Sequence, residues 1–293
     1  MKNMAIPAIV LLALIAAGLP CAGRDGGPWK DKYVQVGDIK IRYLEAGSSE
    51  RTLVFIPGWM MPAEMWKEQI PYFSARGFRV IAMDPRSQGE TTRTEVGNTY
   101  AQHAADLHAF LQALEAERAC LVAWSSGVTT LLEYLSSPEA LKPEKAVFVE
   151  GGPALAKTDD YPGSVTAQQA RRLLLSLQED RAKAMDQYIR GLFKARQPEI
   201  LIKQLLDGGR KTSLGTAATL YFDWFTGDRR SALRHVSVPS LIVTSPENRA
   251  NGEYMQSRIP RSSLEVIDDA GNALFLEKPQ AFNQLLESFL GEI

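Results

Sequence analysis

The sequence has few of the residues that usually build metal sites and disulfide frameworks. It contains two cysteines, Cys21 and Cys120, and three histidines in 293 residues. Two cysteines cannot supply the disulfide framework of a small exported domain, so stability has to come from a hydrophobic core. No histidine has metal-ligand spacing with a cysteine or a carboxylate, which argues against a hydrolytic metal site. We therefore expect no metal and no cofactor.

An excess of charge of either sign is also missing. The chain has 33 Lys and Arg against 34 Asp and Glu, and the two signs are interspersed. No basic stripe for nucleic acid is present, and we find no internal repeat or low-complexity run. With 45% hydrophobic residues, the chain is long enough for one large α/β domain with its own core. The expected partner is a small molecule.

The N-terminal segment has the pattern of an export signal. Lys2 supplies a positive start, and the run from Ala5 to Leu19 is almost wholly apolar. Because this run is slightly short for a membrane span, we interpret residues 1–23 as a cleaved signal peptide. We expect an exported protein, periplasmic or secreted, with no membrane span after signal removal. Pro20 leaves the cleavage site open, and a lipid anchor at Cys21 is the less favoured alternative.

From Lys32 onward, apolar clusters alternate with segments of helical period. This alternation is typical of a mostly parallel sheet with helices on both faces. Two strands joined through Gly37 and Asp38 predict an antiparallel opening. Six further strand candidates follow, in TLVFIPG, FRVIAMD, CLVAWS, KAVFVE, SLIVTS and LEVID. We expect an eight-stranded α/β core over residues 30–154 and 236–293, with an inserted helical cap over residues 155–235.

The most informative stretch is LVAWSSGVTTLLEYL, in which a buried strand runs into a helix. Ser125 lies at the junction, with the small residues Ala123 and Gly127 two positions to either side. This pattern fits a nucleophile elbow, a sharp turn that exposes a serine oxygen at the sheet edge. Ala123 stands where that motif has its first glycine. The helix that begins at Ser126 directs its free backbone N–H groups toward whatever reacts at Ser125.

Three more segments, FIPGWMMPAEMW, MDPRSQGET and DAGNALFLEKPQAF, complete a pattern that resembles the α/β-hydrolase superfamily. The resemblance runs from about residue 32 to the end and is to the lidded branch of esterases, haloperoxidase-like perhydrolases and haloalkane dehalogenases. It implies an oxyanion hole made by the backbone N–H groups of Trp59 and Ser126. We interpret MDPRSQG as structural, with Asp84, Arg86 and Gly89 fixing a loop behind the site.

The same resemblance implies a catalytic histidine where this chain has Asn272, because the family segment resembles GAGHALFLEKP and the chain reads DAGNALFLEKP. An amide accepts no proton near neutral pH and cannot act as a general base. The usual acid position after the seventh strand holds Asn248. Glu150, at the end of the sixth strand, matches the carboxylate of some dehalogenase relatives. Its other interpretation is a residue that caps the strand end.

Neither the other histidines nor the aromatic residues change this picture. His103 and His108 lie on one predicted helix, expected to cover the sheet away from the elbow, and His235 precedes the seventh strand. We interpret all three as surface or packing residues. The predicted pocket is lined by Met60, Trp124 and Trp224, with ordinary packing as the alternative role for the aromatic side chains.

These features predict an exported, lidded α/β-hydrolase homologue with an incomplete triad. It is expected to bind a small apolar ester-like or acyl-like ligand with weak or no hydrolysis, since oxyanion and binding contributions persist without the base. Two alternatives stay open. One is an active serine esterase or acyl hydrolase that uses Ser125 with a non-standard base, such as a water held by Asn272 and Glu150. The other is a non-enzymatic binding or scaffold protein.

Overall fold

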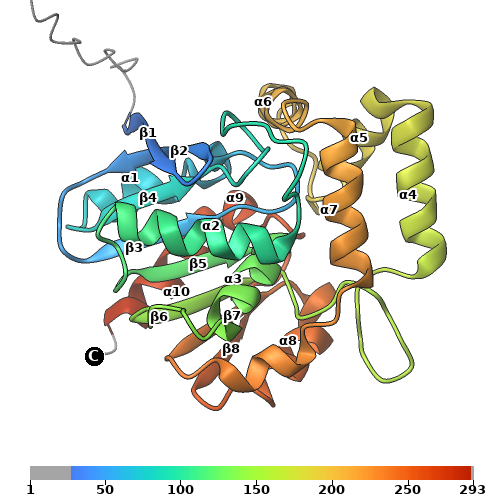
Figure 1. Cartoon of the computed structure of the whole chain (residues 1–293). Helices are drawn as coiled ribbons and strands as arrows, with labels where there is room; N and C mark the ends of the chain where they lie inside the picture. The colour runs from blue at the N-terminus through green and yellow to red at the C-terminus, as the bar shows by residue number, and fades with distance from the viewer. Residues whose placement is uncertain (1–27, 292–293) are drawn as a thin grey trace, which may run out of the picture.

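An eight-stranded sheet crosses the part of the chain that the computed structural model describes, residues 28–291 (Figure 1). The strand order across the sheet is β1-β2-β4-β3-β5-β6-β7-β8. Strand β2 pairs antiparallel with both β1 and β4, and all other neighbours are parallel. The strands are β1 (Lys30–Val36), β2 (Ile39–Ala46), β3 (Thr52–Ile56), β4 (Arg79–Met83), β5 (Cys120–Trp124), β6 (Lys145–Val149), β7 (Ser240–Thr244) and β8 (Ser262–Val266). The eight predicted strands and the antiparallel opening are confirmed.

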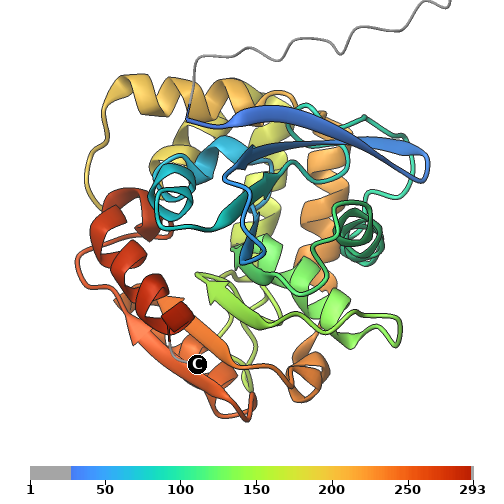
Figure 2. The same cartoon turned by 90° about the vertical axis from the view of Figure 1, so that its left-hand side faces the viewer.

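Helices cover both faces of this sheet, as expected. One face carries α2 (Tyr100–Ala113), α3 (Ser126–Ser136) and α8 (Arg249–Gln256), and the other carries α1 (Gln69–Ser74), α9 (Leu274–Glu277) and α10 (Pro279–Gly291). Side chains alternate between two hydrophobic clusters, because successive residues of a strand point to opposite faces. In β5, Leu121 and Ala123 join the cluster under α2 and α3, whereas Val122 and Trp124 join the other. Figure 2 shows the β1–β2 hairpin, in blue, and strands β7 and β8, in orange, at opposite ends of the sheet.

A helical insert separates β6 from β7 and lies beyond the carboxyl ends of the parallel strands (Figure 1). Side-chain caps begin three of its helices: Thr166 forms a capping box, and Asp180 and Ser213 each accept a backbone N–H. The helical insert consists of α4 (Ala167–Glu179), α5 (Arg181–Arg190), α6 (Glu199–Gly209) and α7 (Leu214–Thr226). Three short 3-10 helices complete the described elements: η1 (Ala63–Trp66), η2 (Arg230–His235) and η3 (Pro246–Asn248).

The expectation of helix throughout residues 155–235 is wrong at its start. Residues 155–166 form an irregular loop with two isolated bridges, one of them between Ala156 and Val165. Pro162 and Gly163 interrupt helical hydrogen bonding there. A Cβ atom at Gly163 would lie 2.1 Å from the carbonyl oxygen of Ala156, so the two arms of the loop approach too closely for a side chain.

Two predictions concern the N-terminal segment. The proposed signal peptide, residues 1–23, and the lipid-anchor alternative at Cys21 lie outside the described residues. Within residues 28–291, no helix has the length and apolar character needed to cross a membrane.

Cys120 is buried in β5 without a disulfide partner, and burial raises the pKa of its thiol to about 12. This agrees with its interpretation as a strand-interior residue rather than a reactive thiol.

Candidate active site

Ser125 stands on the sharp turn between β5 and α3. Its backbone φ of 54° and ψ of −121° are unusual for a residue with a side chain, so the turn stores strain. The Ser125 N–H donates to the carbonyl oxygen of Val149 in β6 at 2.8 Å, which fixes the turn against the neighbouring strand. These features match the nucleophile elbow that the sequence predicts.

Glycines make room for this turn. A Cβ atom at Gly127 would lie 2.7 Å from the carbonyl oxygen of Pro57, and one at Gly151 would lie 2.5 Å from that of Ser125. Real Cβ atoms do not approach oxygen so closely, so a larger residue would push α3 or β6 away from the elbow. The small residues around Ser125 are therefore a requirement of close backbone packing.

The two predicted oxyanion donors follow neighbouring parallel strands. Trp59 lies in a turn after β3 that is closed by the Met61 N–H donating to the Gly58 carbonyl at 3.1 Å. Ser126 is the first residue of α3, so its N–H has no acceptor within the helix. Because β3 and β5 pair in parallel, both groups lie at the same sheet edge. The indole N–H of Trp59 donates to Ala217 of α7 at 2.9 Å, which ties this turn to the helical insert. The role of the Trp59 and Ser126 backbone N–H groups as an oxyanion hole stays a prediction.

Asn272 hydrogen-bonds to Glu150 through its side-chain amide. Its Nδ2 donates to Oε2 of Glu150 at 3.3 Å and to the Glu150 carbonyl oxygen at 3.4 Å. Since both of these partners are acceptors, the amide nitrogen faces Glu150 and Oδ1 faces away. Oδ1 is buried and has no hydrogen-bond partner among the described residues. The carbonyl oxygen of Asn272 accepts the indole N–H of Trp124 at 2.9 Å.

Glu150 is the carboxylate of this arrangement. It follows β6 with a positive φ of 49° and is 6% exposed. Burial raises the pKa of its carboxyl group to about 7, against hydrogen bonds from the Ser245 N–H and from Asn272 that favour the charged form. Near neutral pH, Glu150 is therefore present in both protonation states.

The structure does not bring Asn248 to this cluster. Pro246 starts η3 directly after β7, and this turn carries Asn248 toward the loop at residues 155–166, where it meets Ser164 at 3.5 Å. Asn248 does not line the cavity over the elbow. Of the two acid positions that the sequence left open, the structure places Glu150 beside Asn272.

A cavity of about 380 Å³ lies between the elbow and the helical insert. Trp224 lines it as predicted, but Met60 and Trp124 do not, although both are fully buried. The Trp124 indole is held against the carbonyl of Asn272, and the backbone of Met60 is held by Gln88. Three further lining residues, Gln169, Gln187 and Tyr188, were not predicted. They lie on α4 and α5, and the sequence does not tell which face of these helices points to the cavity. The lining comprises Ser125, Glu150, Gly151, Gly152, Ala154, Leu155, Ser164, Val165, Gln169, Leu173, Gln187, Tyr188, Gly191, Leu192, Tyr221, Trp224, Asn251 and Asn272.

None of the three histidines lines this cavity. His103 is buried in α2 against Tyr100, and burial lowers the pKa of its imidazole to about 4. His108 faces the ring of Tyr134, and His235 is exposed at the end of η2. Within residues 28–291, no cluster of three or more His, Cys, Asp or Glu side chains is arranged to hold a metal ion.

The MDPRSQG segment supports the loops around the site. Asp84 is fully buried and accepts hydrogen bonds from the backbone N–H groups of Ala63, at 2.7 Å, and Glu90, at 2.9 Å. It also pairs with Arg42 at 3.1 Å, while Arg86 pairs with Asp106 at 2.7 Å. These contacts agree with the structural role that the sequence predicts for this segment.

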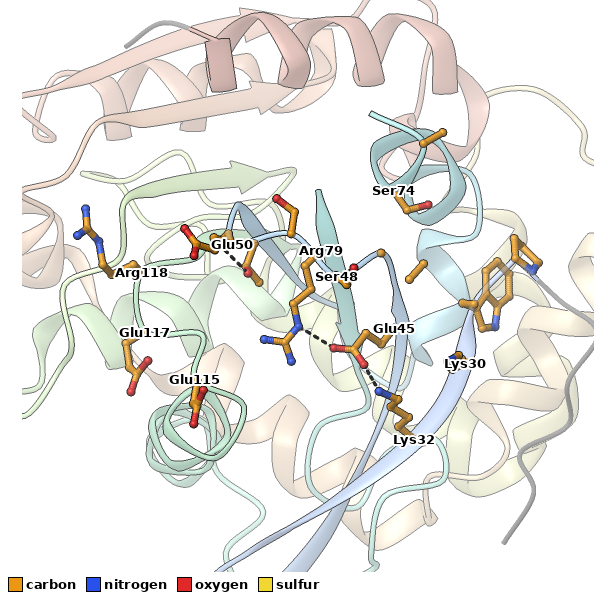
Figure 3. A pocket seen from close by; sticks show the side chains of 17 residues that line it. Lys30, Lys32, Glu45, Ser48, Glu50, Ser74, Arg79, Glu115, Glu117 and Arg118 are labelled. Carbon is orange, nitrogen blue, oxygen red and sulfur yellow. Dashed lines mark hydrogen bonds and ion pairs between the residues drawn. The ribbon is translucent and has the colours of Figure 1, made fainter. Parts of the chain in front are cut away.

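A larger cavity, of about 1200 Å³, lies near the amino ends of β3 and β4, at the sheet edge opposite the elbow (Figure 3). The Glu45 carboxylate there is held between Lys32 and Arg79, at 2.7 Å from the latter. No histidine or cysteine is among the residues that line it. It lies far from the strand-to-helix turn that carries Ser125, so the smaller cavity over Ser125 is the better candidate for chemistry.

A serine on a strained strand-to-helix turn, at the carboxyl end of a central parallel strand and beneath inserted helices, defines an α/β-hydrolase type of protein. The chain belongs to the alpha/beta hydrolase family, whose model matches residues 53–285. It is 26% identical to a non-heme chloroperoxidase from Kitasatospora aureofaciens, over 93% of this chain and 99% of the relative. It is also 26% identical to a bifunctional esterase/perhydrolase from Acinetobacter calcoaceticus, over 74% of this chain and 82% of the relative. A bromoperoxidase structure from Bacillus anthracis superimposes with a TM-score of 0.84 at 25% identity, covering 90% of this chain and 100% of that one.

Proposed function

We propose that the cavity over Ser125 binds a small, mostly apolar ester-like or acyl-like ligand, which the protein hydrolyses slowly or not at all. The observation that carries this proposal is the 3.3 Å hydrogen bond from Asn272 Nδ2 to the Glu150 carboxylate, in a cavity that Ser125 also lines. This contact supports the proposal that an amide stands where a serine triad has its imidazole.

The chemical consequence concerns the proton of Ser125. A serine hydroxyl attacks an acyl carbon efficiently only when a neighbouring base removes its proton. Asn272 Oδ1 accepts a hydrogen bond but not a proton. In subtilisin, loss of the histidine lowers turnover about a millionfold, while the oxyanion hole and substrate binding retain part of the acceleration. The same arithmetic predicts a slow reaction here.

The size and lining of the cavity support a small ligand. A volume of about 380 Å³ is at the lower end of ordinary ligand sites. Leu155, Val165, Leu173 and Leu192 supply apolar surface, and the inserted helices act in this proposal as a lid. A relative named as a bifunctional esterase/perhydrolase supports an ester or acyl group as the part of the ligand that lies at Ser125.

The decisive experiment compares wild-type protein with Asn272→His. Hydrolysis of nitrophenyl butyrate should rise by a factor of about 100 or more in Asn272→His, because a positioned general base contributes at least that much. The gain should disappear in the Ser125→Ala, Asn272→His double variant, which controls for hydrolysis elsewhere on the protein. Labelling with a fluorophosphonate should follow the same order.

One result would overturn the proposal. If wild-type protein turns over the ester at about 10 per second, an ordinary enzymatic rate, and loses this activity in Ser125→Ala, the triad is functionally complete.

A specific observation favours a second candidate, an active esterase with a non-standard base. Glu150 lines the cavity together with Ser125, and its pKa of about 7 would suit a water molecule that relays the Ser125 proton. In that case wild-type activity should rise with an apparent pKa of about 7 and be lost in Glu150→Gln. Esterase activity that is slow and independent of Glu150 rules this candidate out.

We also propose that the protein is exported, on the strength of the pattern from Lys2 to Leu19. Expression of the full chain, cell fractionation and N-terminal sequencing of the mature protein test this directly. Recovery of uncleaved protein from the cytoplasm alone would contradict it.

A further inference from the structure

The charge of the cavity over Ser125 is one-sided. Glu150 is the one Asp, Glu, Lys, Arg or His side chain among its lining residues. A ligand carboxylate would therefore meet a buried carboxyl group with no cation beside it, and this arrangement is unfavourable in a site of low dielectric constant.

The Glu150 carboxylate is held at the cavity wall by two hydrogen-bond donors. The Ser245 N–H donates to its Oε1, and Asn272 Nδ2 donates to its Oε2 at 3.3 Å. Asn272 Oδ1 is buried and faces away from Glu150, so it takes no part in this arrangement. Because neither donor is a cation, the buried carboxylate favours a ligand donor of positive charge.

Aromatic rings also line the cavity. Tyr188, Tyr221 and Trp224 all come from the helical insert, and the rings of Tyr221 and Trp224 meet edge to face with centroids 6.2 Å apart. The π faces of such side chains attract cations as well as apolar groups. An ammonium group is therefore compatible with the aromatic as well as the acidic lining of the cavity.

We propose that the ligand of this site carries a protonated amino group, which binds against the Glu150 carboxylate while its ester or acyl group lies at Ser125. This inference rests on the proposed function, because it assigns a substrate class to the same cavity. A nearby ammonium also favours the charged form of Glu150, so binding and ionisation reinforce each other.

Three small esters of matched shape test this proposal: β-alanine ethyl ester, which is cationic, ethyl butanoate, which is neutral, and monoethyl succinate, which is anionic. Calorimetric titration uses the full mature chain with Ser125→Ala, which prevents turnover, at a pH of about 8, where a carboxyl group with a pKa near 7 is mostly ionised. The cationic ester should bind about tenfold more tightly than the neutral one, and the anionic ester most weakly.

Variants in the same background locate the preference. Glu150→Gln should reduce it to about twofold or less, because the carboxylate is lost while the shape is kept. Glu150→Ala should reduce it in the same way, and serves as a second variant if Glu150→Gln does not fold. Glu95→Gln is the matched control, since Glu95 is an exposed carboxylate outside the cavity, and it should keep the preference.

The outcomes separate the two proposals. If the neutral ester binds as tightly as the cationic one, the ammonium proposal is overturned and the proposed function stands. If the preference persists unchanged in Glu150→Gln, or in Glu150→Ala where that variant is used, the ammonium site lies elsewhere and the inference is wrong. If none of the three esters binds, the proposed function fails together with it.

Discussion

Ser125 meets two demands at one residue, a reactive hydroxyl and a backbone conformation that a side chain disfavours. Its φ of 54° lies in a region that glycine adopts without conflict. Ser125→Gly should therefore unfold with a free energy about 1 kcal/mol higher than Ser125→Ala, because both variants lose the hydroxyl and only the glycine relieves the strain. Urea denaturation of the two purified variants measures the difference. Equal midpoints would mean that the elbow is not strained.

Asn272 and Glu150 show how far single residues are predictable. The motif DAGNALFLEKP predicts that Asn272 stands at the family's histidine position, because the residues on both sides of it resemble the family segment. Whether Glu150 or Asn248 lies beside it depends on the turn after β7, where Pro246 begins η3. Motif matching reports positions along the chain and carries no information on that turn. The alternative was therefore decided only by the folded geometry.

At the scale of elements, the close approach of α3 to the end of β3 depends on Gly127, which has no side chain. A Cβ atom at Gly127 would lie 2.7 Å from the Pro57 carbonyl oxygen and 2.8 Å from that of Ile56. Backbone oxygens cannot move aside as a flexible side chain does, so Gly127→Ala should lower the free energy of unfolding by more than about 2 kcal/mol. It should also reduce fluorophosphonate labelling in an Asn272→His background, because the elbow shifts.

Gly215 provides the matched control for this substitution. It lies in α7, where the nearest atom to an added Cβ is Ser213 Oγ at 4.0 Å. Alanine is the better helix former, so Gly215→Ala should raise the free energy of unfolding by about 0.5–1 kcal/mol. Thermal unfolding of both variants tests the pair. A similar loss in both would show that the effect at Gly127 does not come from the contact with Pro57.

Elements differ in how much of their role the sequence carries. The strands are predictable because each is a short apolar run between turn residues. Their parallel orientation follows from the helices that connect them. The helical insert is predictable as helix, but its contribution to the cavity is not. Gln187 and Tyr188 are consecutive on α5 and both line the cavity, so their shared role arises from how the helix packs over the elbow. Amphipathic periodicity alone does not report that packing.

In the whole molecule, buried ionisable groups act on stability in opposite directions. Burial raises the pKa of Asp84 to about 6 and of Glu150 to about 7, so both carboxyls hold protons in the fold that the unfolded chain has released. Their contribution falls as pH rises. Burial lowers the pKa of His103 to about 4, and its contribution is instead lost as pH falls below 6.5. The overall pH profile mixes these effects, so one group is resolved only by a matched variant.

Glu150→Gln isolates the largest of these carboxyl effects. The folded pKa of about 7 lies above the unfolded value of 4.5, so the protonated carboxyl stabilises the fold below pH 4.5, and this stabilisation is lost as pH rises through 7. The free energy of unfolding of wild-type protein minus that of Glu150→Gln should fall by about 3 kcal/mol across this window. Asp84 and His103 are present in both proteins, so their contributions cancel. Urea titrations at several pH values measure the difference, and a difference that does not change with pH would place an ordinary, ionised carboxylate beside Asn272. That result would strengthen the attraction for an ammonium group at neutral pH and remove the pH-dependent base on which the esterase alternative depends.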